Sequence, residues 1–165
     1  MAVPRDFSLS DFSSLYKQYA PDVHRFALYL SGQRADAEDI TSETFARVWA
    51  SPESVVMATV KGYLFTIARH LFLQGLRKTS RHETLDEDLL DPSVGPAEHA
   101  EQSATLQSVL KELQRLPEAS RSALLMYAVD GMAYDEIARV LDISLPAVKV
   151  KIHRARLALA GVRDA

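Results

Sequence analysis

Residues 134–159 read YDEIARVLDISLPAVKVKIHRARLAL, and this stretch decides the fold class of the C-terminal part of the chain. Within 134–141, apolar residues recur at the three- and four-residue steps of a short helix. A tight turn at 142–144 follows, and the Ser144 hydroxyl is suited to cap the next helix. Pro146 then stands in the first turn, where its missing N–H costs nothing. The stretch therefore predicts a helix-turn-helix.

The second helix of this motif has two chemically different sides. An apolar side predicts burial and consists of Val148, Ile152, Ala155 and Leu159. The opposite side holds Ala147, Val150 and a series of cations, and residues 143–163 carry five bases and no acid. This division suits a helix in the major groove of DNA, where residues near the N-terminal end approach base edges and later cations reach phosphates. The predicted DNA contacts of this motif are Ser144, Ala147, Lys149, Lys151, His153, Arg154 and Arg156.

Charge along the 165 residues is segregated into blocks, although the formal net charge is only -3. Residues 61–82 carry five bases and no acid, whereas residues 83–101 carry seven acids and no base. The local field, and not the total charge, decides which partners a surface attracts. The basic blocks therefore favour nucleic acid despite the negative total, although a single run of charge can also be a solvated helix face.

Helical periodicity runs through almost the whole chain, and no segment alternates with the period of a β-strand. We predict an all-α fold of two small domains, an N-terminal helical bundle at 8–81 and a C-terminal helix-turn-helix domain at 105–163. Residues 82–104 lose the periodicity, contain prolines, a glycine and the acidic run, and predict a flexible linker. Pro21 lies inside the first helical pattern and predicts two abutting helices or a kink.

The helix predicted at 60–80 is apolar on more than one side, which is typical of the central helix of a bundle. Its aromatics and its basic end also fit a track for single-stranded nucleic acid, made by phosphate contacts and base stacking. For Phe65 and Phe72 we prefer burial in the core over stacking on bases. The polar candidates for contacting a strand are Arg69, His70, Gln74, Arg77, Lys78 and Arg81.

Acidic residues crowd the start of the helix predicted at 37–49. Negative charge near a helix N-terminus is favourable with the helix dipole, and this explains part of the cluster. Together with Arg47 and Trp49, the remaining acids also fit a face on which a partner docks, because Trp is a frequent interface anchor. The sequence leaves both interpretations open.

Several classes of protein are disfavoured by what the sequence lacks. Without cysteine there is no disulfide scaffold, thiolate zinc site or cysteine nucleophile. No basic start followed by an apolar run marks a secretory signal, and no apolar stretch is long enough to span a bilayer, so we expect a soluble cytoplasmic protein. There is no glycine-rich phosphate loop or nucleophile–base set, and the five histidines lack metal-ligand spacing. We therefore expect neither an enzyme nor a bound cofactor or metal.

Three motifs, in order along residues 10–160, resemble those of bacterial RNA polymerase sigma factors of the extracytoplasmic-function (ECF) type. DAEDI with ETF and RVW, within 36–49, resembles the family's polymerase-binding helix. YLFTIARH running into LRK, within 63–78, resembles its promoter-melting and minus-ten recognition helix. LP, GMAYDEIA and HRARL, within 116–157, resemble its minus-thirty-five recognition domain.

The resemblance implies an initiation factor that binds core RNA polymerase and directs it to specific promoters. Such a factor recognises and melts the minus-ten element of promoter DNA and binds the minus-thirty-five element. The resemblance further implies a monomer when free of partners and an anti-sigma factor that holds the chain inactive. The alternative is a helix-turn-helix transcriptional regulator that does not act as a polymerase subunit. The polymerase contacts implied are Asp36, Asp39, Glu43, Arg47 and Trp49.

Departures from the family pattern limit what can be carried over. His70 and Gln74 stand where the family often has Asn and Asp, so the minus-ten sequence preference cannot be copied. The segment 145–147, Leu-Pro-Ala, replaces a more usual glycine-containing turn, so the upstream base preference cannot be copied either. Ala133 stands where Ser is frequent, which removes a cap from the following helix.

Overall fold

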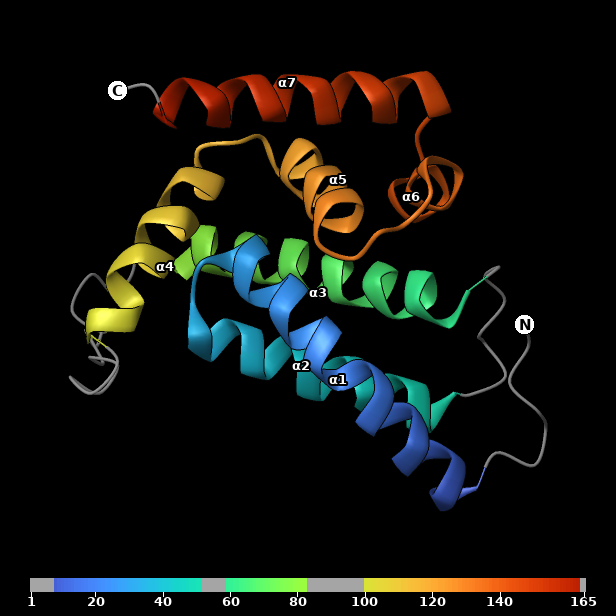
Figure 1. The fold of residues 1–165 in the computed structure, drawn as a ribbon. Helices are drawn as coiled ribbons and strands as arrows, with labels where there is room; N and C mark the ends of the chain where they lie inside the picture. The colour runs from blue at the N-terminus through green and yellow to red at the C-terminus, as the bar shows by residue number, and fades with distance from the viewer. Residues whose placement is uncertain (1–7, 52–58, 83–99, 164–165) are drawn as a thin grey trace.

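The computed structural model describes residues 8–51, 59–82 and 100–163, which form helices joined by short connections. No β-strand occurs within these ranges (Figure 1), so the predicted all-α fold is confirmed. In chain order the helices are α1 (Leu9–Ser31), α2 (Arg34–Ala50), α3 (Val60–His82), α4 (Ala100–Gln114), α5 (Glu118–Ala128), α6 (Tyr134–Leu141) and α7 (Leu145–Arg163).

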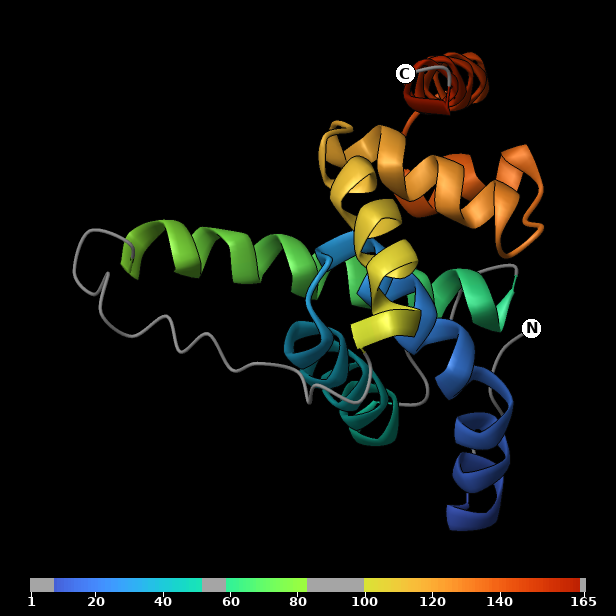
Figure 2. The ribbon, with the colours of Figure 1, turned by 60° about the vertical axis from the view of Figure 1, so that its left-hand side comes forward.

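α1 is one continuous helix with Pro21 inside it, so of the two outcomes predicted at Pro21 the abutting helices are wrong and the bent helix remains. The helix changes direction along its length (Figure 2), and its buried apolar side holds it together across the missing backbone donor. A capping box fixes the start, because the Asp11 amide donates to the Ser8 hydroxyl and the Ser8 amide donates to the Asp11 carboxylate. Gly32 ends α1 with a φ of 72°, in the left-handed region that favours glycine.

The N-terminal half packs α1, α2 and α3 around an apolar core. The rings of Phe26 on α1 and Phe65 on α3 stack with their centroids 4.5 Å apart, and both side chains are buried. Phe72 is buried as well, which confirms the preference for core packing at Phe65 and Phe72. α3 contacts α1 and α2 and also α6 of the other half, as predicted for a central helix.

The C-terminal half contains the predicted helix-turn-helix, formed by α6 and α7. The turn between them holds Asp142 at a φ of 55° and packs Ile143 against the core. The Ala147 amide donates to Ser144 Oγ over 3.2 Å, which confirms Ser144 as the cap of α7. α6 has no side-chain cap, because Ala133 stands at that position.

The two halves are packed against each other and share one apolar core. α3 contacts α6, and α1 contacts both α4 and α5. Figures 1 and 2 show α4, α5 and α6 seated on the N-terminal bundle, with α7 on the outer side. α4 begins at Ala100, inside the range predicted as linker, whereas residues 83–99 of that range lie outside the described residues.

Replacing Phe65 by Ala removes one ring of the stacked pair and leaves a cavity in the core. We expect the free energy of unfolding to fall by about 3–5 kcal/mol, measured by urea denaturation. Leu76→Ala, on the same helix but with a side chain that is 49% exposed, is the control. Its effect should stay within about 0.5 kcal/mol, and equal losses at the two positions would contradict the core assignment.

Candidate nucleic-acid interface

α7 presents the predicted cations to solvent and buries its apolar side. Val148, Ile152 and Ala155 are buried against the rest of the C-terminal half. Figure 1 shows the opposite side of α7 on the outside of the molecule. The structure therefore brings all seven residues predicted to contact DNA to one helix and the turn before it. Of these, Ser144, Lys149, His153, Arg154 and Arg156 are exposed, and Ala147 and Lys151 are half-buried.

Two tyrosine rings, for which the sequence predicts no role, form cation–π contacts with two cations on one flank of α7. Arg156 Cζ lies 5.0 Å from the centroid of the Tyr127 ring, and Lys149 Nζ lies 6.0 Å from that of Tyr134. The two rings are 4.9 Å apart, and hydrogen bonds from Tyr134 and Arg156 hold the pKa of Tyr127 below its ordinary value. Periodicity carries no signal for this arrangement, because the tyrosines come from α5 and α6.

The residues predicted to bind single-stranded nucleic acid lie on two different sides of α3. His70, Gln74, Arg77 and Lys78 are exposed. Arg69 lies apart from them, because its side chain is only 15% exposed and faces α5. The side chain of Arg81 lies outside the described part of the structure.

Arg69 forms a bidentate ion pair with Glu118 of the C-terminal half. Its Nε lies 2.6 Å from Oε1 of Glu118, and its second terminal nitrogen lies 2.9 Å from Oε2. Burial alone would raise the pKa of Glu118, but hydrogen bonds from Arg69 and Ser122 hold that pKa below its ordinary value. A guanidinium paired in this way is not available to a phosphate. The DNA contact predicted for Arg69 therefore requires this pair to separate.

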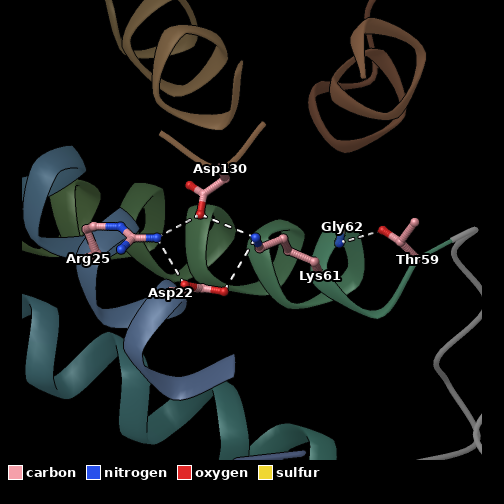
Figure 3. A network of polar contacts seen from close by, with 6 residues as sticks. All are labelled: Asp22, Arg25, Thr59, Lys61, Gly62 and Asp130. Carbon is pink, nitrogen blue, oxygen red and sulfur yellow. Dashed lines mark hydrogen bonds and ion pairs between the residues drawn. The ribbon is translucent and has the colours of Figure 1, made fainter. Parts of the chain in front are cut away.

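A second set of ion pairs joins Asp130, in the loop before α6, to two cations of the N-terminal half (Figure 3). Asp130 Oδ1 lies 3.3 Å from Arg25 and 3.5 Å from Lys61 Nζ. Asp22 completes the network at 3.0 Å from Arg25 and 3.4 Å from Lys61. Burial raises the pKa of Asp130, and the two cations offset only part of that effect. Lys61, a member of the predicted basic block, is therefore neutralised in this arrangement.

A third contact between the halves depends on Gly62. The Thr59 hydroxyl donates to Oε1 of Glu136 over 2.6 Å, and it also accepts from the Gly62 amide over 2.9 Å. A Cβ at position 62 would lie 1.9 Å from that same oxygen of Glu136. A side chain at residue 62 would therefore force the Glu136 carboxylate to move away from Thr59.

Arg121 is buried where the ends of α1 and α4 meet the start of α5. Its guanidinium donates to the backbone carbonyls of Leu30, Leu113 and Leu116, the last two over 2.9 Å and 3.1 Å. Burial lowers the pKa of Arg121, and Glu118 acts in the opposite direction. We call the following contacts together the half–half interface: Arg69 with Glu118, Asp130 with Arg25 and Lys61, Glu136 at Gly62, and Arg121 at Leu30.

The predicted polymerase contacts lie on α2, on the opposite side of the molecule from α7 (Figure 1). The three acids and Arg47 share one side of the helix, and Trp49 stands on another. Asp36, Asp39 and Glu43 are exposed, and Glu43 pairs with Arg47 at 3.5 Å. Trp49 is 48% exposed and packs its ring edge-on against an aromatic side chain of α1. Burial, and to a lesser degree the charge of Asp39, raises the pKa of Asp36. The three acids also line a groove of about 330 Å³ between α2 and α3.

In the described ranges, no group of three or more His, Asp or Glu side chains is placed to hold a metal ion. Among the helices of those same ranges, none combines the length and apolar character needed to cross a bilayer.

Known proteins match the chain along most of its length. A family model described as Sigma-70 region 2 matches residues 15–82, and one described as Sigma-70, region 4 matches residues 106–159. The ECF RNA polymerase sigma factor SigM of Bacillus subtilis is 32% identical over 153 residues, which cover 90% of this chain and 92% of SigM. The chain belongs to the ECF sigma factors. The ECF RNA polymerase sigma factor SigE of Mycolicibacterium smegmatis is 35% identical over 157 residues, but the match spans only 60% of the length of SigE.

Solved structures share the fold of this ECF sigma factor. RpoE from Bartonella quintana, solved in complex with the anti-sigma factor NepR, matches with a TM-score of 0.79 and 28% identity, over 95% of this chain and 99% of RpoE. CnrH, solved with the cytosolic domain of CnrY, has the same fold at a TM-score of 0.73 and 22% identity, over 95% of this chain and 90% of CnrH. Sigma factors are non-enzymatic initiation factors that direct RNA polymerase to promoters. Membership of this family does not favour the alternative interpretation, in which the chain is a helix-turn-helix transcriptional regulator that does not act as a polymerase subunit.

Gly62→Ala tests whether the missing side chain holds the halves together. Ala favours the helix over Gly by about 1 kcal/mol, but its Cβ displaces the Glu136 carboxylate from Thr59, so we expect the packing of the halves to weaken. Because the chain has no cysteine, a pair of fluorescent dyes can be attached at Ser42→Cys and Ala160→Cys, one in each half. The energy transfer between the dyes should be lower with Gly62→Ala than with Gly62.

The matched control is Gly75→Ala, on the same helix. It gains the same helix propensity, but nothing lies within 4 Å of its added Cβ, and energy transfer should stay unchanged. A loss of transfer in both variants, or in neither, would show that Gly62 has no special role at the half–half interface.

Proposed function

We propose that this ECF sigma factor docks on core RNA polymerase through the exposed face of α2 and holds promoter DNA at two places. α3 holds the unpaired strand of the minus-ten element, and α7 enters the major groove of the minus-thirty-five element. The observation that carries this proposal is the presence of two separate exposed cationic helices, in segments that match Sigma-70 regions 2 and 4. The domains are then 8–81 and 105–163, with 82–104 between them.

On α3, the exposed cations Arg77 and Lys78 bind phosphates, and His70 and Gln74 lie beside them to contact bases. Arg69 joins this surface once its pair with Glu118 separates. On α2, the acids and Trp49 form the polymerase contact, in which the aromatic ring supplies apolar area and the acids supply charge complementarity.

We call the arrangement in which the two halves are packed against each other the closed arrangement. It must open for this function. The minus-ten and minus-thirty-five elements are separated by about 25 base pairs, or roughly 85 Å of B-DNA at 3.4 Å per base pair. In the closed arrangement α3 is in direct contact with α6, through pairs such as Thr59 with Glu136. One molecule therefore places α3 and α7 on both elements only after the half–half interface has separated.

We further propose that an anti-sigma factor binds this chain, since RpoE was solved in complex with the anti-sigma factor NepR. Free of partners, the chain is a monomer. Because core RNA polymerase is in the cytoplasm, we place the protein there, with no catalytic activity of its own.

Run-off transcription with purified core enzyme and a promoter library tests the proposed function. We expect transcripts that start at defined sites and share elements at minus ten and minus thirty-five. If the chain binds specific DNA but does not direct the polymerase to defined start sites, it is a transcriptional regulator that does not act as a polymerase subunit.

Glu43→Lys reverses one charge on the proposed polymerase face of α2. Like charges brought together at an interface cost several kcal/mol, so we expect affinity for core enzyme to fall at least tenfold, measured by fluorescence anisotropy. The control is Asp135→Lys, an equal charge change at an exposed position on α6. A larger loss from Asp135→Lys would place the polymerase contact elsewhere.

A further inference from the structure

The outward side of α7 carries an apolar stripe between its cations. At 3.6 residues per turn, Val150 and Leu157 stand opposite the buried residues of the helix. Their side chains are 45% and 60% exposed. We call Val150 and Leu157 the outward stripe. On the proposed DNA-reading helix, these branched side chains are placed for an apolar contact in the groove.

The first turns of α7 offer few hydrogen-bonding side chains to base edges. The segment 145–148 is Leu-Pro-Ala-Val, and the Ser144 hydroxyl before it already accepts from the Ala147 amide. Lys149 lies to one flank, with its Nζ 6.0 Å from the Tyr134 ring. The side chains that pair with the edges of guanine and adenine are Arg or Lys and Asn or Gln, and between Ser144 and Val150 these are represented by Lys149 alone, on the flank toward Tyr134.

Cations border the outward stripe on both sides. Lys149 and Arg156 lie on the flank supported by the tyrosines, and Lys151 and Arg154 lie on the other flank. No acid occurs in α7. Two cationic rows separated by an apolar stripe match the two phosphate backbones that border the major groove. This charge pattern selects duplex DNA, and not an apolar protein surface, as the occupant.

The major groove displays one apolar feature, the C5-methyl group of thymine. We infer that Val150 is a specificity-determining residue that contacts thymine methyl groups in the upstream promoter element. This inference rests on the proposed function, because it takes α7 as the helix that enters the groove. It makes thymine the preferred base at the positions that face Val150, with selection by methyl contact instead of hydrogen bonding.

Replacement of thymine by deoxyuridine tests this inference, because deoxyuridine lacks only the methyl group. Holoenzyme, made from the full chain and core polymerase, is bound to a promoter taken from the run-off library, with each upstream thymine replaced in turn. For the wild-type chain, we expect one or two positions at which affinity falls about three- to fivefold, as for the loss of one buried methyl group. With Val150→Ala, the same replacements should change affinity less than about 1.5-fold.

Arg154→Ala is the matched control on α7. It removes a phosphate contact, so it should weaken binding to thymine and deoxyuridine promoters alike and leave their ratio unchanged. Promoter binding in which no position responds to deoxyuridine, or responds equally with Val150→Ala, overturns the inference alone. If Val150→Ala instead weakens binding to core enzyme, the stripe is a protein-docking surface and the inference is wrong. A holoenzyme that selects no promoter overturns the proposed function as well.

Discussion

The closed arrangement depends on the buried guanidinium of Arg121. It donates to the carbonyls of Leu30, Leu113 and Leu116, which lie at or beside the ends of α1 and α4. The last carbonyls of a helix have no partner within that helix, and burying them unpaired is costly. A buried guanidinium without acceptors is costly too. Arg121, Leu113 and Leu116 belong to one half and Leu30 to the other, so separation of the halves breaks the bond to Leu30 and leaves its carbonyl to be hydrated.

This packing gives α3 two different sides. The side toward the C-terminal half holds Arg69 in an ion pair and brings Gly62 against α6. The other side leaves His70 and Lys78 exposed. α7 has no such division, since its whole cationic side faces outward. The two proposed DNA surfaces therefore differ in access, and only that of α3 is partly covered in the closed arrangement.

The sequence was sufficient for the helices, the helix-turn-helix and the outward side of α7, because periodicity and capping act over a few residues. It was insufficient where the deciding contact is distant along the chain. Arg69 lies 49 positions from Glu118, and Arg25 lies 105 positions from Asp130, and no spacing marks these pairs. At Pro21, the packing of α1 outweighs the local preference for a break. The partners assigned to exposed residues stay predictions, because exposure alone does not select a partner.

The two acids of the half–half interface respond to protons in opposite directions. Asp130 has a raised pKa when the halves are packed, so its contribution to closure weakens as pH rises through that pKa. Glu118 has a lowered pKa, so its contribution is present above the ordinary value and weakens as pH falls through the lowered one. Acidification thus favours packing at Asp130, because it removes a buried charge, and disfavours packing at Glu118, because it removes the charge that pairs with Arg69. Protons therefore do not drive the two halves in a single direction.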